Sequence, residues 1–421
     1  MDLSTYDPIL KEHYLPPIRE LLNSDMKLYE YLNDGDEYIE GKYAYIPMHV
    51  GRNEGIGSRA EDGTLPTAGS QQYDNATYSS RYIYGQIRIT GPVEAASRST
   101  TGAFEKALDR EISGLMRDMK HEVNRQMWAT GSGILGILNA AVSNSTTVTM
   151  YTTSTTIYAQ NIRAVRKNMK IDLRKVTDGT LITSGGDSAT VSSVASDGTI
   201  TLSAAVTTGT GTIGIYREDT RNLDPYGLGS IVSARNPDYV DTEGASSTGI
   251  TDLGSNDRDS LLEWKAQSLF NSGVLRPLEL ELLDQAQDQV ETESEAEDLV
   301  VWFTNHAMRR KFASLLLPER RFTGASGKPQ GYDGGYKKDD LSYNEVPIKV
   351  DKMAPKYRIF GLCKSSLYAF KMNDWDWMDK DGAILSRESG KDAYGATLKT
   401  YRQTGSGNPN SCVIIGDLDE S

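Results

Sequence analysis

The longest regular pattern of apolar positions lies between residues 102 and 129. Apolar residues recur there every three or four positions, and charged residues occupy the remaining faces. Thr100 and Thr101 precede the pattern as candidate caps, and Gly131 follows it as a stop signal. At 1.5 Å per residue the pattern predicts a helix roughly 42 Å long, which we call the spine helix. Its expected packing residues are Phe104, Leu108, Ile112, Leu115, Met119, Val123 and Met127.

Residues 37–92 carry the two-residue period of β-strands on both sides of a glycine-rich segment. Apolar and polar residues alternate through Tyr43–Ile46, and Ile83, Ile87 and Ile89 share one face of the return strand. Because a two-stranded hairpin alone is marginally stable in water, we predict a long β-hairpin that lies over a neighbouring subunit, in preference to a disordered insertion. The charged residues of its tip, candidate inter-subunit contacts, are Arg52, Glu54, Arg59, Glu61 and Asp62.

Two further segments differ from their surroundings. Residues 1–36 carry a narrow apolar stripe after Pro16-Pro17, which predicts a terminal arm that needs a surface on which to dock. Residues 170–218 are rich in Thr, Ser, Gly and Val, and Ser196-Asp197-Gly198 is a hairpin signal. This second segment is predicted to be a small β-rich insertion.

Helical spacing returns after about residue 259. No Lys or Arg occurs between Pro277 and Met308, so the helix predicted around Leu278, Leu282 and Ala286 is acidic. We expect a buried strand at 299–303, a helix at 306–317, strands near 346–350 and 357–362, and an extended tail. One basic cluster follows the acidic helix, and we favour its pairing with that helix between subunits over contact with nucleic acid. The cluster consists of Arg309, Arg310, Lys311, Arg320 and Arg321.

Composition narrows the class of protein. With 421 residues, 38% hydrophobic and 24% charged, the chain is long enough for two or more structural units. It has neither a membrane-spanning apolar run nor the start of a signal peptide, and Cys363 and Cys412 are its only cysteines, so we expect synthesis in a reducing cytoplasm and no membrane contact. The net charge of −13 argues against gripping nucleic acid, although not against enclosing it.

Residues with catalytic or ligand-binding chemistry do not form a convincing site. Gly209–Gly214 matches a dinucleotide-binding pattern, but it lies in a Thr/Gly β region and predicts a turn. Gly324–Pro329 lacks the spacing of a phosphate loop, and Asp374–Gly382 lacks the register of a calcium loop and reads as a solvated turn. Trp375 and Trp377 indicate packing or an interface, and the four histidines, among them His121 on the polar side of the spine helix, lack metal-ligand spacing. We therefore predict no catalytic residue, cofactor or metal, and a protein that is not an enzyme.

The order of these parts resembles the major capsid proteins of tailed bacteriophages, which have the Hong Kong 97-type capsid fold. Each stretch that carries the resemblance is moderately specific, and their order is more so. The stretches are Gly55–Glu61, Ile87–Pro92, Phe104–Trp128 with Gly131-Ser132-Gly133, Tyr343–Ile348 with Asp351, and Asp374–Asp379.

The resemblance implies an α+β fold and a division of the chain into domains. The hairpin would be the extended loop that reaches over an adjacent subunit, and the central region would gather around five-fold and six-fold axes. The implied division is an arm at 1–36, an extended loop at 37–92, a peripheral domain with the spine helix at 93–135, an axial domain with the β-rich insertion at 136–364, and return strands of the peripheral domain at 365–421.

The resemblance also implies a function. Copies would self-assemble into hexamers and pentamers of an icosahedral or prolate phage head around double-stranded DNA, without sequence-specific contact. The expected location is the virion, after assembly in the host bacterial cytoplasm. A portal protein is an implied partner, and a decoration protein is left open. Because the chain begins directly at the arm, we expect a separate scaffolding protein and not a fused one.

Some relatives weld the extended loop to a neighbour through a Lys–Asn isopeptide bond. Here the segment 51–82 contains no Lys, and only Lys42, low on the hairpin, is available. We therefore expect a non-covalent shell, in which the spine helix and the hairpin pivot when DNA fills it.

Three alternatives stay open at this level. A protein nanocompartment of the same fold would enclose a cargo enzyme instead of DNA. A tail-fibre-like β adhesin is suggested by the Thr/Ser-rich insertion, although the spine helix argues against it. The third alternative is an enzyme without a recognisable motif.

Overall fold

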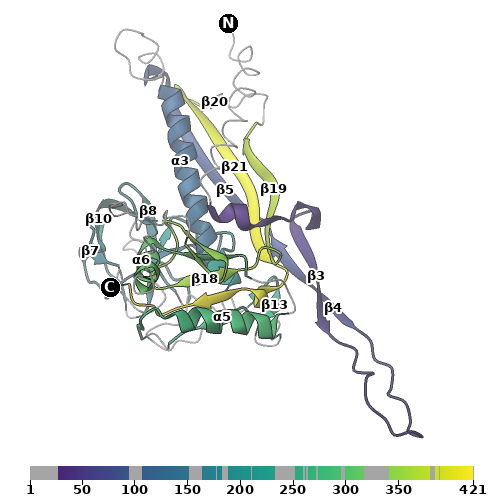
Figure 1. Cartoon of the computed structure of the whole chain (residues 1–421). Helices are drawn as coiled ribbons and strands as arrows, with labels where there is room; N and C mark the ends of the chain where they lie inside the picture. The colour runs from purple at the N-terminus through teal and green to yellow at the C-terminus, as the bar shows by residue number, and fades with distance from the viewer. Residues whose placement is uncertain are drawn as a thin grey trace, which may run out of the picture.

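A computed structural model shows an elongated part, a projecting hairpin and a body (Figure 1). The long helix α3 (Ala107–Trp128) runs beside the strands of the elongated part (Figure 1). The hairpin extends from the end of that part that lies near the body (Figure 1). The structure describes residues 27–93, 107–150, 164–176, 178–182, 188–209, 211–232, 252–258, 261, 264–271, 274–294, 299–316, 341–379, 385–387 and 389–420.

The elongated part is built on one sheet, the spine sheet. Strand β21 lies at its centre, between β19 and β5, and pairs with β5 from Thr90↔Ala393 to Arg81↔Arg402. The strands are β1 (Asn33–Asp34), β19 (Leu367–Trp377), β21 (Ala393–Ser406), β20 (Ser386–Arg387) and β5 (Arg81–Thr90).

Helix α3 (Ala107–Trp128) packs closely on β5 because a glycine faces it. A Cβ atom on Gly85 would lie 2.6 Å from Sδ of Met119 and 2.8 Å from Cδ1 of Leu115. The missing side chain lets helix and strand approach within van der Waals contact. The described part of α3 agrees with the helix predicted for 102–129.

The hairpin consists of β3 (Tyr43–Gly51) and β4 (Gln72–Ser79), which pair from Tyr43↔Ser79 to Gly51↔Gln72, with β2 (Ile39–Glu40) on the other side of β3. The segment through Ile83, Ile87 and Ile89 is a strand, but its predicted place as the return strand of the hairpin was wrong. It is β5 of the spine sheet and pairs with β21. Alternation identifies a strand and its buried face, but it does not identify the partner of that strand.

A mixed six-stranded sheet, the central sheet, forms the core of the body. The predicted acidic helix is α5 (Leu280–Glu293), and the helix after the buried strand is α6 (His306–Leu315). Strand β22 lies between β14 and β18, whereas we predicted it among the return strands of the peripheral domain. In order across the sheet the strands are β14 (Gln267–Leu269), β22 (Val413–Ile415), β18 (Ile359–Leu362), β15 (Val301–Thr304), β17 (Val346–Val350) and β16 (Ser342–Tyr343).

A second six-stranded sheet has its own apolar core and forms the β-rich unit. The hairpin predicted at Ser196-Asp197-Gly198 is confirmed, since Asp197 Oδ1 accepts from the Thr199 amide at 2.9 Å and Gly198 has φ +93°. The unit extends beyond the predicted 170–218, because β6 and β7 join it. Its strands are β6 (Ile134–Ile137), β11 (Ile213–Arg217), β8 (Lys170–Lys175), β9 (Ala189–Val194), β10 (Thr199–Val206) and β7 (Ser145–Thr149).

The described end of the predicted arm packs on its own chain. Leu28 is 1% exposed, Tyr31 meets Phe303 edge to face at 5.3 Å, and β1 pairs in parallel with β19. For residues 27–36, the surface on which the predicted arm docks is therefore its own chain, while residues 1–26 lie outside the described part. The remaining short elements are η2 (Lys27–Tyr31), η3 (Asp36–Tyr38), α4 (Leu228–Ile231), β12 (Asp252–Leu253), β13 (Asn256–Asp257) and η7 (Pro409–Ser411).

The turn between β16 and β17 allows a stability prediction. Asn344 and Glu345 have φ +46° and +66°, as in the type I′ turns that favour Asn-Gly. We expect Glu345→Gly to stabilise the chain by about 0.5–1 kcal/mol, because glycine removes the strain of a left-handed Cβ. Urea unfolding would measure this, with Glu345→Ala as the control, since alanine keeps the Cβ and should bring no gain. A lower midpoint for Glu345→Gly would contradict the prediction.

Candidate functional site

The hairpin tip, residues 52–71, is held by contacts within itself. Arg52 Nε lies 3.0 Å from Oε1 of Glu54, with both side chains more than three-quarters exposed, and this pairing raises the pKa of Arg52. Arg59 donates to the backbone oxygens of Thr64 at 3.0 Å and Ser58 at 3.1 Å. The predicted charges are therefore on the tip, but Arg52 and Arg59 are held locally, and Glu61 and Asp62 are exposed.

Two apolar side chains of the tip lack cover from their own chain. Ile56 is 83% exposed and Leu65 is 81% exposed. Charge patterning alone did not single them out. Burying such side chains against a partner is favourable at about 25 cal/mol per Å², which no contact inside the described chain supplies. These two residues, together with the charged ones, form the candidate contact surface at the tip.

The base of the hairpin is anchored firmly. The Tyr78 hydroxyl donates to the Ser406 carbonyl at 2.7 Å and accepts from the Ser406 amide at 3.1 Å, and burial raises its pKa. Its ring stacks on Phe370 at 5.5 Å, and the absence of a side chain at Gly405 makes room for it. The Thr77 amide also donates to the Gly254 carbonyl at 2.7 Å. The hairpin is thus joined to the spine sheet before it leaves the body.

Most predicted spine residues that the structure describes are buried. Ile112, Met119, Val123 and Met127 are buried, and Leu115 packs against the same core. The stripe is wider than predicted, because Met116 and Trp128 are also buried. Phe104 and the side chain of Leu108 lie outside the described residues.

The C-terminal half of α3 carries a buried ion network that the sequence did not reveal. Arg125 lies 2.7 Å from Glu122 and 2.5 Å from Asp224, and Arg217 reaches Glu122 at 2.8 Å. Gln126 also donates to Asp224 at 3.0 Å. Burial by itself raises the pKa of Glu122, but attraction to the two arginines outweighs it, and the pKa falls below its usual value. The network ties the spine helix to the segment that follows β11.

The described residues of the basic cluster form no ion pair with the acidic helix of their own chain. Arg309, Arg310 and Lys311 lie on α6, and Arg320 and Arg321 fall outside the described residues. Within the described segments, no carboxylate of α5 forms an ion pair with α6. The exposed carboxylates of α5 are Glu281, Asp284, Asp288, Glu291 and Glu293.

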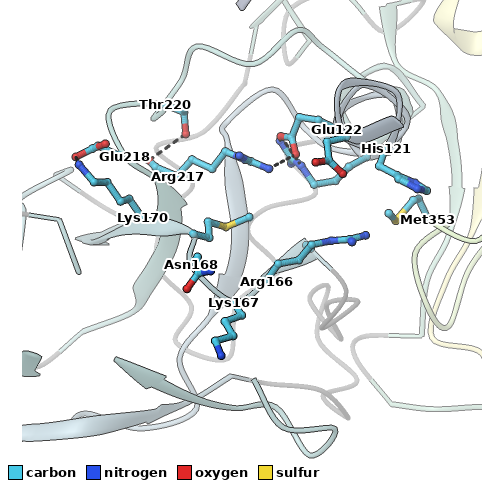
Figure 2. A pocket seen from close by; sticks show the side chains of 14 residues that line it. His121, Glu122, Arg166, Lys167, Asn168, Lys170, Arg217, Glu218, Thr220 and Met353 are labelled. Carbon is cyan, nitrogen blue, oxygen red and sulfur yellow. Dashed lines mark hydrogen bonds and ion pairs between the residues drawn. The ribbon is translucent and has the colours of Figure 1, made fainter. Parts of the chain in front are cut away.

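A cavity of about 490 Å³ lies between α3, the segment 164–170 and the turn after β11 (Figure 2). His121 lies at its wall and not at an isolated surface position. Burial lowers the pKa of His121, and the positive charge of Arg166 lowers it further. On another wall, Lys170 pairs with Glu218 at 3.3 Å (Figure 2). The cavity is lined mainly by charged and polar side chains.

The arrangement of these parts has a counterpart among solved structures. A chain of the cyanophage A-1(L) capsid asymmetric unit aligns with 94% of this chain and 93% of its own length, at a TM-score of 0.53 and 11% identity. The chain has the Hong Kong 97-type capsid fold. The α+β prediction and the resemblance inferred from the sequence are thereby confirmed.

Other solved structures with this capsid fold align at lower scores. The SrpI encapsulin from Synechococcus elongatus aligns over 94% of this chain and 90% of its own, with a TM-score of 0.45 and 6% identity. A structure titled Mycobacterium phage Bobi aligns over 94% and 90%, with a TM-score of 0.43 and 8% identity. No protein-family model matches the sequence, and no curated protein matches it by sequence.

On this capsid fold, the sequence motifs that suggested ligand binding lie in the apolar core or on strands. Trp375 is fully buried beneath the Arg402 guanidinium at 4.5 Å, and Trp377 is buried as well, which confirms packing. Asp374 and Asp376 lie on strand β19, so the predicted solvated turn was wrong there. Gly214 of the dinucleotide-like pattern lies in β11.

The described part of the chain holds neither a clustered set of metal-binding side chains nor a membrane-spanning helix. No group of three His, Cys, Asp or Glu side chains there is placed to hold a metal ion. None of the helices described combines the length and apolar character required to cross a membrane. The second sequence pattern set aside, Gly324–Pro329, lies outside the described residues.

Proposed function

We propose that this chain is the major capsid protein of a tailed bacteriophage, and that its role is assembly and not catalysis. The observation that carries the proposal is the hairpin, which is anchored through Tyr78 and projects from the body with Ile56 and Leu65 exposed (Figure 1). An anchored hairpin that presents apolar side chains away from its own chain supports contact with another copy. The capsid fold supports the same reading.

The geometry suggests how copies join. A hairpin that reaches from one copy onto a different surface of the next is a heterologous contact, which closes into rings or continues without limit. Rings of five and six copies, joined at their edges, would close the shell, with obligate interfaces of about 2,000 Å² or more. With no Lys in residues 51–82, we propose that the tip is held by burial and ion pairs and not by an isopeptide bond.

The other partners belong to the same proposal. Double-stranded DNA would be enclosed without sequence-specific contact, since a chain with net charge −13 repels phosphates more than it grips them. A portal protein at one vertex and a separate scaffolding protein would complete assembly in the host bacterial cytoplasm, with the shell as part of the virion. The proposed axial domain is the central sheet and the β-rich unit, and the proposed peripheral domain is the spine sheet with α3.

Electron microscopy of the full chain expressed alone, together with light scattering, tests this proposal. Closed polyhedral particles or rings of five and six copies are the expected result. A monodisperse monomer would contradict the proposal. If shells form, the contents of particles purified from infected cells distinguish the two kinds of container. A phage head contains double-stranded DNA, whereas a nanocompartment contains a cargo enzyme.

Charge reversal tests whether α5 and α6 meet between copies. We expect Arg310→Glu with Lys311→Glu to suppress assembly, because like charges would then face each other at every repeated contact. Each exposed pair contributes only about 0.2–1 kcal/mol, but the contact repeats around each ring. Light scattering measures assembly.

The matched control reverses the other side of the proposed contact. Asp288→Lys with Glu291→Lys should suppress assembly alone and restore it when combined with the α6 pair. Normal assembly of both single-sided variants would remove this contact from the proposal, and so would suppressed assembly that the combined variant does not recover.

A further inference from the structure

The cavity beside the spine helix has an unusual charge for this chain. Its wall carries five permanent cations and three carboxylates, although the whole chain has a net charge of −13. Including Asp224, which pairs with Arg125 from behind, cations still outnumber carboxylates. The cations are Arg125, Arg166, Lys167, Lys170 and Arg217, and the lining carboxylates are Asp118, Glu122 and Glu218.

Most of these charges are already neutralised by neighbours. Glu122 is shared by Arg125 and Arg217, and Glu218 pairs with Lys170 and accepts from the Ser188 hydroxyl at 2.6 Å. Among the five cations, Arg166 and Lys167 are the exceptions, because no carboxylate of the described residues lies within ion-pair distance of either side chain. Figure 2 shows Arg166 extending towards α3, where His121 and Glu122 lie, while Lys167 extends away.

Arg166 and His121 therefore face a shared space, which Asp118 also lines. Their proximity is unfavourable when the imidazole is charged, as the pKa of His121, lowered by burial and by Arg166, indicates. A doubly negative oxyanion would accept hydrogen bonds from a guanidinium and an imidazolium together. The Asn168 amide also lines the cavity and could supply a neutral donor.

We propose that this cavity binds a phosphate-type oxyanion between Arg166 and His121. The proposal goes beyond the shell-forming function and does not depend on it. A bound oxyanion would link α3 to the segment leading into β8, and so would tie the spine helix to the β-rich unit. The size of the cavity admits a free phosphate or a mononucleotide, and both present the same chemistry.

Calorimetric titration of the full chain with sulfate tests the site, at constant ionic strength maintained with chloride. Sulfate is a suitable probe because it stays doubly negative across the pH range, whereas phosphate groups titrate near neutrality. Saturable binding is expected, and Arg166→Gln should weaken it by about tenfold or more. The control is Arg110→Gln, which removes an exposed arginine of α3 that does not line the cavity and should leave binding unchanged.

The pH dependence provides a second readout. As pH falls through the pKa of His121, which burial and Arg166 lower, the imidazole gains a proton. The charged groups that act on this imidazole are Arg166 from the segment before β8, and Asp118, Arg117 and Lys120 from α3. Since the oxyanion favours the imidazolium, sulfate should bind more tightly at the lower pH, and His121→Gln should abolish this increase. A pH dependence that is unchanged in His121→Gln would overturn the assignment of His121.

Two further titrants identify the source of the oxyanion. Orthophosphate that binds as well as a mononucleotide indicates a free-anion site, and tighter binding of the mononucleotide indicates a phosphate ester. Either result supports the proposal if Arg166→Gln abolishes the binding of the anion. The proposal fails if the wild-type chain shows no saturable binding of sulfate. It also fails if Arg166→Gln and Arg110→Gln weaken the binding of sulfate to the same extent, and that of duplex DNA likewise, because such a result indicates an effect of general surface charge.

Discussion

Arg125→Met should destabilise the folded chain by about 3–5 kcal/mol, because it leaves two buried carboxylates without their shared cation. Arg125 contacts both Glu122 and Asp224, and its side chain is only 10% exposed. Methionine retains most of the apolar stem, so lost packing contributes little. Urea unfolding followed by far-UV circular dichroism would measure the change.

Two controls separate uncompensated charge from other effects. Arg110→Met, at an exposed position of the same helix, should change stability by less than about 0.5 kcal/mol. Adding Glu122→Gln and Asp224→Asn to Arg125→Met should recover part of the loss, since no buried charge then lacks a partner. A variant with all three changes that is no more stable than Arg125→Met would contradict the charge explanation.

The loss should also depend on pH. In the wild-type chain the pKa of Glu122 is lowered, so its contribution is present above the unfolded-state pKa and is lost as pH falls through the folded-state value. In Arg125→Met only Arg217 still opposes the effect of burial, so the pKa of Glu122 rises from its wild-type value. The difference in stability between the two proteins should therefore be largest near pH 7 and shrink towards pH 4.5.

Replacing the hairpin tip, residues 52–71, by Asn-Gly should abolish shell formation while leaving the fold intact. Gly51 and Gln72 are partners in the hairpin, so a two-residue turn can join β3 to β4 without changing their register. The base stays anchored because Tyr78 and its contact with Ser406 are unchanged. Electron microscopy would follow assembly, and near-UV circular dichroism would report the packing of the aromatic core. Normal shells from this variant would contradict the proposed role of the tip.

A milder change tests the exposed apolar residues of the tip. Ile56→Ser with Leu65→Ser keeps the length and charges of the tip but removes its apolar contacts. We expect the concentration needed for assembly to rise by about tenfold or more, which corresponds to about 1.4 kcal/mol per contact. Glu61→Gln with Asp62→Asn is the matched control, and we expect a smaller effect that weakens with salt.

Local patterns in the sequence predicted the elements with good accuracy. The stripe on α3, the acidic helix α5 and the hairpin turn at Asp197-Gly198 depend on residues within a few positions of each other, and helical spacing and turn chemistry act over that range. The order of these elements was enough to indicate the capsid fold. The charged tip of the hairpin was also found from composition.

Tertiary structure decided which elements meet, because strand alternation carries no information about partners. It placed β5 beside β21 instead of within the hairpin, and it placed β22 in the central sheet. It also joined Arg125 to Asp224, 99 positions further along the chain, and brought Arg166 towards His121. In the sequence these charges read as solvated helix faces and loops. The burial of Arg125 and Asp224, and the neighbours of all these charges, follow only from packing the β-rich unit against the spine helix. The pattern of charges along the sequence is the same whether water or another segment covers them.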